Sequence, residues 1–226
     1  MAISLDFSSV LEQWPLFLDG ARLTVELATV ATLSGFVLGT LCAVGLRSGT
    51  WVARLCSAYV EAIRNTPLLV QIFLVYFGLA SLGLRLSAFV VAALALTINV
   101  AAYTAEIMRA GLDSIPAGQI EAGECLGLSH VQLYWHVLLL PAMERVYPAL
   151  ASQFVLLMLA SSVCSQISAE ELTAVANHVQ SETFRPFEAF IVLAGFYIAL
   201  SILMRAAFWG IGLLLFSRRR RLGTAL

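Results

Sequence analysis

Long stretches without a charged residue are the feature that most limits how this chain can fold. Residues 27–46, 65–84, 86–105 and 146–169 contain no charged side chain, and residues 189–217 contain only Arg205. About 20 apolar residues of helix cross a bilayer, and a spanning segment must satisfy its own backbone hydrogen bonds. We therefore expect an all-α membrane protein with five transmembrane helices in a single domain over residues 1–226. The approximate spans are 20–46, 62–84, 86–108, 146–168 and 188–210.

Composition agrees with the bilayer as the solvent of this chain. Hydrophobic residues make up 60% of its 226 residues and charged residues only 12%, whereas a soluble domain usually carries about a quarter. The net charge of -1 gives no reason to expect a nucleic-acid partner. Every basic residue is an arginine, and a phosphate-binding P-loop needs its lysine. The chain therefore cannot bind ATP in the common way.

The arginines predict an orientation. With five spans, the loop at 47–54, the loop at 109–145 and the C-terminal tail share one side of the membrane. That side carries Arg47, Arg54, Arg109, Arg145 and Arg218–Arg221, against Arg22, Arg85 and Arg185 on the other. Arginine-rich loops stay in the cytoplasm. We expect a cytoplasmic C-terminus and an N-terminus outside.

Two arginine features allow alternative interpretations. The run Arg218–Arg221 is read as a topology anchor at the lipid headgroups, in preference to a nucleic-acid patch. At Arg205, either the fifth span ends and the following apolar stretch lies along the membrane interface, or the arginine faces other helices. We favour the first, because an arginine near a helix end can extend its charge to the interface.

The long loop at 110–144 is too ordered in composition to be a plain linker. Pro116 suits the first turn of a helix, and Gly127 suits the end of one. Ser129 and Gln132 form a capping box for a second helix, which we expect Pro141 to end. The loop should thus be a short helix, a glycine hinge and a more apolar helix. From the residues alone, the short helix could pack on its own bundle, lie at the headgroups or dock on another protein.

The loop also carries a sequence pattern. Glu121, Ala122 and Gly123, then Gly127, then Leu140 and Pro141, resemble the "EAA" loop of ABC importer permeases, with glycine in place of the usual second alanine. The stretches "YVEAIRNTPLLVQIFLVYFGL", "AAYTAEIMRAGLDSIPAGQIEAG", "EELTAVA" and "RPFEAF" resemble permeases of the histidine, arginine, glutamine and opine group. The resemblance covers nearly the whole chain.

This resemblance implies a function and partners. The chain would be the permease subunit of an ATP-driven importer, carrying half of the pathway for a polar amino acid, basic ones included. An opine or another amino-acid derivative is the alternative substrate. Its partners would be two ATPase subunits that bind ATP and Mg²⁺, a second permease of different sequence, and a periplasmic or extracellular amino-acid-binding protein. The chain would lie in the bacterial cytoplasmic (inner) membrane, hold no cofactor and receive ATPase motion through the EAA loop, in which Glu121 and Gly127 would be the key positions.

Polar residues inside the predicted spans are candidates for the substrate pathway. Hydrogen bonding between helices is the structural alternative for each of them. The candidates are Thr66, Gln71, Asn99, Tyr103, Gln153, Ser161, Ser162 and Gln166. Relatives often carry a "K-x-T-S-L"-like stretch in the fourth span, where this chain has "LASSV", so substrate contacts of relatives transfer poorly to it.

Two other classes of protein fit the sequence less well. An intramembrane enzyme would need a nucleophile with a base or a metal site, and the sequence has neither G-x-S-x-G nor H-E-x-x-H. A scaffold or channel would not need a docking loop for an ATPase. We expect no catalytic residue and no metal site in this chain.

Overall fold

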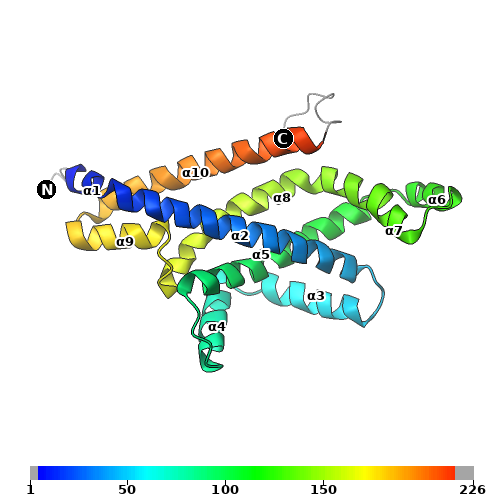
Figure 1. The fold of residues 1–226 in the computed structure, drawn as a ribbon, viewed down its shortest axis with the longest axis horizontal. Coiled ribbons are helices and arrows are strands. Elements are labelled where there is room, and N and C mark those ends of the chain that lie inside the picture. Colours follow the sequence, from blue (N-terminus) through cyan, green and yellow to red (C-terminus); the bar gives the residue numbers. More distant parts are fainter. Residues whose placement is uncertain (1–4, 217–226) are drawn as a thin grey trace.

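The structure, a computed structural model, describes residues 5–216 and is all-helical over that range (Figure 1). Arg218–Arg221, the predicted anchor, lie outside the described residues. The helices, in chain order, are α1 (Ser8–Glu12), α2 (Trp14–Leu46), α3 (Trp51–Arg64), α4 (Leu68–Ser81), α5 (Ala88–Asp113), α6 (Ala117–Cys125), α7 (His130–Gln132), the π-helix η1 (Leu133–Leu139), α8 (Leu140–Ala160), the 3-10 helix η2 (Ser161–Ile167), α9 (Leu172–Thr183) and α10 (Pro186–Leu215).

By length and apolar composition, four helical stretches could each cross a membrane, or five if α3 and α4 together form one span. The four are α2, α5, the stretch Leu133–Ile167 and α10. The predicted stretches 20–46 and 188–210 fall inside α2 and α10, and the stretch 86–108 begins just before α5 and ends inside it. The prediction of an all-helical membrane protein is confirmed at this level.

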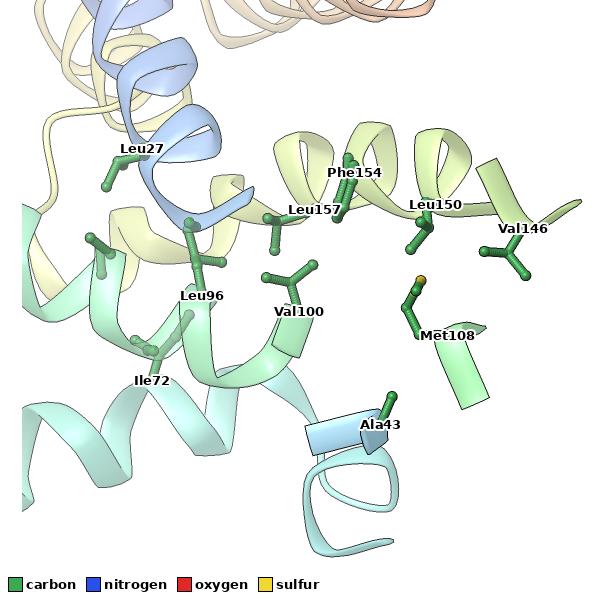
Figure 2. Packing of buried hydrophobic residues seen from close by; sticks show 14 of the residues in the cluster. Leu27, Ala43, Ile72, Leu96, Val100, Met108, Val146, Leu150, Phe154 and Leu157 are labelled. Atoms are coloured by element: carbon green, nitrogen blue, oxygen red, sulfur yellow. The ribbon is translucent and has the colours of Figure 1, made fainter. Parts of the chain in front are cut away.

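Helix α5 forms the centre of the bundle, between α2 and α8. Its side chain Val100 faces Leu157 and Phe154 of α8, and Met108 faces Leu150 (Figure 2). On the α2 side, a methyl group added to Gly39 would lie 2.6 Å from the Ala101 carbonyl oxygen of α5. Small residues let helix backbones approach this closely, and such packing drives helix association in lipid.

The ends of the helices gather into two groups. At one end, which we call the arginine end, Arg47 after α2 bonds Asp113 at the end of α5 (Nη1–Oδ1, 2.9 Å), and Arg145 of α8 donates to Ser114. At the opposite end, Thr24 of α2 accepts a hydrogen bond from the Leu172 amide of α9 at 3.1 Å. Helix α6 lies at the arginine end and α9 at the other (Figure 1).

The predicted second span, 62–84, is not one straight helix. Helices α3 and α4 meet at a bend of 111° around residues 65–67, and α4 points away from the rest of the bundle (Figure 1). Pro67 has no N–H to continue the helical hydrogen bonds and lies in an extended conformation (φ -63°, ψ 141°). The prediction of this span rested on the absence of charged residues from 65–84, a stretch that includes the bend. That criterion therefore cannot detect the bend.

Pro141 does not end the second helix of the loop, which corrects the sequence prediction. The chain is helical from His130 through Pro141 to Ala160. The π-helical turn Leu133–Leu139 shifts the hydrogen-bond register just before Pro141, which takes one of the first positions of α8. The missing N–H of Pro141 therefore falls at the junction where the hydrogen-bond register changes from π-helix to α-helix, which lets the helix continue through the proline. The helix of the fourth span therefore begins before residue 146.

Arg205 does not mark the end of the last span. Helix α10 continues unbroken through it to Leu215, so the favoured interpretation, an interfacial segment after Arg205, is wrong for the described residues. Arg205 instead lines a groove against α8. The second interpretation, in which Arg205 faces other helices, fits in part, because Arg205 borders α8 at this groove but is exposed.

Candidate functional site

The elbow between α5 and α8 forms as its sequence predicts. Helix α6 begins after Pro116 and ends before Gly127, whose φ of +73° is a conformation that favours glycine. The Leu128 amide donates to the Gly123 carbonyl at 3.2 Å, a bond that closes helices ending in this way. The capping box is present too, because the Ser129 amide donates to the Gln132 side chain at 3.0 Å. The predicted helix, glycine hinge and second helix are confirmed.

Helix α6 packs on η1 of its own chain and leaves the rest of its surface uncovered. Gly123 is buried, while Glu121, Ala122 and Cys125 are exposed. Leu126 is 81% exposed and Val131 79% exposed. Uncovered apolar side chains beside an acid at a membrane protein's tip are typical of a contact surface for another protein. Sequence reasoning missed both apolar residues, although each flanks the glycine hinge.

Gly123 is the point where the elbow is fixed to the bundle. A methyl group at this position would collide with Cδ1 of Leu133 and lie 3.5 Å from Val137. The glycine that replaces the usual alanine is therefore matched by a leucine in η1. Leu140 and Pro141, the other end of the pattern, lie in the first turn of α8, with Leu140 half exposed.

A chain of ion pairs lies at the arginine end, at the base of the elbow. Glu106 contacts Arg109 at 2.6 Å and Arg64 of α3 at 3.7 Å. Arg109 also contacts Asp113 at 3.1 Å, and Asp113 contacts Arg47. These contacts connect α2, α3 and α5, so the chain of pairs can hold this end closed. Its members are partly exposed, and each such pair contributes little on its own.

Glu61, a neighbouring acid on α3, makes none of these pairs. Its side chain accepts a hydrogen bond from Ser57 at 3.2 Å, one turn away on α3. Glu61 lines a cavity of about 480 Å³ between α3 and α5, together with the paired residues Arg64, Glu106 and Arg109. The lining of this cavity therefore carries both acidic and basic side chains.

Three of the pathway candidates come together at the break between α3 and α4. The Gln71 amide nitrogen donates to the Ile63 carbonyl at 2.7 Å and to the Thr66 carbonyl at 3.0 Å. The Asn99 amide of α5 donates to Gln71 Oε1 at 2.8 Å. These bonds satisfy carbonyls that the interrupted helix leaves open. These hydrogen bonds stabilise the bend. They support the structural alternative for Thr66, Gln71 and Asn99, which is hydrogen bonding within and between helices.

The remaining pathway candidates lie on other helices. The Arg64 guanidinium lies over the ring of Tyr103 of α5, with its Cζ atom 5.9 Å from the centre of that ring. Ser161 is buried and donates to the Met158 carbonyl at 2.7 Å. Ser162 is half-buried and its carbonyl accepts from Ser165. Gln153 is half-buried on α8 and Gln166 is exposed on η2. Since η2 packs against α4, the two groups of candidates lie on neighbouring elements.

Glu171, at the opposite end, is a buried acid that sequence reasoning did not single out. It caps α9, accepting from the Thr173 amide at 2.9 Å and the Ala174 amide at 3.0 Å, and it accepts from the Tyr197 hydroxyl at 2.8 Å. Burial raises the pKa of its carboxyl, although these hydrogen bonds act in the opposite direction. The sequence signal for this role was the position of the acid directly before a helical stretch, where an acid can cap the helix.

Comparison with known proteins identifies the family. The profile described as "Binding-protein-dependent transport system inner membrane component" matches residues 35–211. The chain is 36% identical over 202 residues to the probable glutamine ABC transporter permease protein GlnM of Bacillus subtilis (strain 168), which covers 88% of this chain and 92% of that protein. It is 36% identical over 214 residues to the octopine transport system permease protein OccM of Rhizobium meliloti, covering 90% and 87%.

A solved structure agrees with these relatives. The chain superposes on a chain from the crystal structure of an amino acid ABC transporter with histidines with a TM-score of 0.84. The two are 34% identical, and the match covers 93% of this chain and 99% of that one. The resemblance inferred from the motifs is confirmed. The chain belongs to the family of binding-protein-dependent transport system inner membrane components, as a multi-pass inner membrane permease subunit of an ABC transporter that is distinct from the ATPase.

Proposed function

We propose that this subunit carries half of the pathway for a polar amino acid in an ATP-driven importer, basic amino acids included. The support is the similarity over nearly the whole length to a protein named for glutamine and to a solved amino acid transporter. An opine is the second candidate substrate, because the octopine relative is equally similar at 36% identity.

The proposed assembly contains two ATPase subunits, a second permease of different sequence and a periplasmic or extracellular amino-acid-binding protein. ATP and Mg²⁺ belong to the ATPase subunits, since this chain has no lysine with which to build a P-loop. The lipid bilayer surrounds the permeases. No nucleic acid takes part.

The grouping of the helix ends at the two sides of the bundle supports five membrane crossings. Helices α2 and α5 both finish at the arginine end, joined by Arg47 and Asp113. Ser87, just before α5, lines a groove with Glu26 of α2 and Glu171 at the other end. The chain therefore passes from one end to the other between Arg47 and Ser87, and the bent pair α3–α4 is one broken span. Arginine content makes the arginine end cytoplasmic.

Helix α6 is the proposed coupling helix, and the observation that carries this proposal is its asymmetric packing. One face is fixed to η1 through Gly123, and the other presents Glu121 and Leu126 to the cytoplasm. Force applied to the exposed face passes into α8, because η1 and α8 form one continuous helix. Closure of two ATPases would move two such helices and shift the spans between inward and outward access, as alternating access requires.

The coupling role predicts a loss of transport without a loss of protein. Glu121→Lys reverses the charge of the exposed face, and Gly127→Leu forces a bulky residue into a backbone conformation with φ of +73°. Both variants should reduce ATP-driven uptake at least tenfold while membrane abundance stays within twofold of the wild type, an effect of about 1.4 kcal/mol or more. Uptake and abundance are measured together, with co-purification of the ATPase.

The matched control is Glu12→Lys, which makes the same charge change on exposed α1 at the opposite end. It should leave uptake and ATPase binding unchanged. Normal uptake in both the Glu121 and Gly127 variants would remove the coupling role from α6.

A further inference from the structure

A groove of about 380 Å³ runs between α8 and α10, and a single charged side chain, Arg205, lines it. Ser152 of α8 supplies a hydroxyl and Trp209 of α10 supplies an indole, while Pro148 and Val155 of α8 form an apolar wall. Neither the ion-pair chain at the arginine end nor α6 contributes to this groove. The groove therefore needs an explanation of its own.

Arg205 has no anionic partner within the described part of its own chain. It is the one charged residue between 189 and 215, and no carboxylate in residues 5–216 forms an ion pair with it. A charged residue inside a membrane helix is costly unless it is paired or reaches the headgroups. A partner from outside the chain would remove that cost.

The position of Arg205 along the bundle favours the headgroup region of one leaflet. Its groove neighbour Ser152 lies about two helical turns from Arg145, which contacts Ser114 at the arginine end. Arg205 itself lies about 15 Å before the end of α10 at Leu215. A long arginine side chain extends from such a depth toward the phosphates while its stem stays in the apolar layer.

The outer surface of α10 is suited to acyl chains. Ile202 is 61% exposed, Leu203 65% and Trp209 54%, and tryptophan is enriched at membrane interfaces. A second groove of about 390 Å³ lies between α2 and α10, lined by apolar side chains such as Val25 and Leu203. That groove offers no charge to a headgroup. Of these two grooves, the Arg205 groove is the one that combines an apolar wall with a cation.

We propose that the Arg205 groove binds the phosphate of an anionic phospholipid, such as phosphatidylglycerol, from the leaflet at the arginine end. The guanidinium presents paired N–H donors that fit phosphate oxygens, and the Ser152 hydroxyl can add a further donor. Basic pockets between membrane helices on the cytoplasmic side are suited to such headgroups. The inference uses the membrane placement of α10 and does not depend on which amino acid is transported.

Native mass spectrometry of the intact complex, delipidated and then titrated with phosphatidylglycerol, tests this site. Arg205→Gln should weaken the binding of this lipid about fivefold, which corresponds to about 1 kcal/mol for one basic residue. Arg205→Lys keeps the charge and should retain most of the binding. Arg22→Gln removes an exposed arginine at the opposite end, whose partner is Glu26 at 2.8 Å, and should change nothing.

Several results would overturn the proposal. One is equal retention of phosphatidylglycerol by the wild type and Arg205→Gln. A second is binding of added inorganic phosphate with no lipid bound. A third is absence of the lipid from the intact complex because another subunit covers the groove. If Arg205→Gln fails to accumulate, wild-type protein is titrated with phosphatidylglycerol and zwitterionic phosphatidylcholine. Preference for the anionic lipid supports the site, and equal binding of the two contradicts it.

Discussion

Gly123 and Leu133 show how one residue choice can be matched by another ten positions away. Because a methyl group at position 123 would overlap Leu133, Gly123→Ala should overpack the contact between α6 and η1 at a cost of about 1–3 kcal/mol. Uptake should fall, and the double variant with Leu133→Val should recover much of it. Gly118→Ala is the control, since nothing lies within 4 Å of that position in the same helix. Uptake and thermal stability are measured for the wild type, Gly123→Ala, Leu133→Val and the double variant, which together form a double-mutant cycle.

Additive losses in that cycle would show that the two residues do not act as a pair. The sequence alone marks Gly123 as a departure from the family pattern and assigns it only a helix-propensity cost of about 1 kcal/mol. It cannot show the compensation by Leu133, because contacts between a short helix and the next one depend on how the hinge folds.

Glu171 predicts a pH dependence with a defined sign. Burial raises the pKa of its carboxyl in the folded protein, so the folded state binds the proton more tightly than the unfolded state. Stability from this group is then greatest at low pH and falls as pH rises from about 4.3, the ordinary value, through the raised one. Glu171→Gln stays neutral, so its melting temperature should decline less with pH over this window. Glu170→Gln, at an exposed neighbour, should keep the wild-type slope, and equal slopes in all three proteins would contradict the assignment.

At the scale of elements, the break between α3 and α4 depends on Gln71. Gln71→Leu would leave the Ile63 and Thr66 carbonyls and the Asn99 amide without their partner. Each unsatisfied buried group costs about 1–3 kcal/mol, so we expect a lower midpoint of thermal melting in detergent. Gln166→Leu is the matched control, because Gln166 is exposed on η2. Equal melting of the two variants would mean that the network does not hold the bend.

Sequence reasoning succeeded where the signal is local and failed where it depends on tertiary contacts. The ends of α6 follow from Pro116 and Gly127, and the capping box at Ser129 follows from spacing alone. The continuation through Pro141 depends on a π-helical turn, and the groove at Arg205 depends on how α10 lies against α8. Neither arrangement leaves a period or a spacing in the sequence.

At the scale of the whole molecule, the five proposed crossings predict which loops face which compartment. In a background with Cys42, Cys56, Cys125 and Cys164 replaced by alanine, Arg85→Cys should react with a membrane-impermeant thiol reagent added outside the cell. Ser48→Cys should react only after the membrane is opened. Both positions are exposed in loops, so a buried site does not explain a negative result. Labelling of both from the same side would mean that α3 and α4 form a re-entrant loop.

Helix α4 leans out from its own bundle, and on it Leu74 remains 67% and Phe77 62% exposed. In a hydrocarbon environment avoidance of water does not favour the burial of such side chains, so packing against a neighbouring subunit would have to cover them. A permease made without its companion would hold the arm through the polar bonds at the hinge and through the packing of its inner side, such as Ile72, on α5 and η2, while its outer side would lack a protein neighbour. We expect the orphaned subunit to be short-lived in the cell, with synthesis of the companion setting how much of it accumulates.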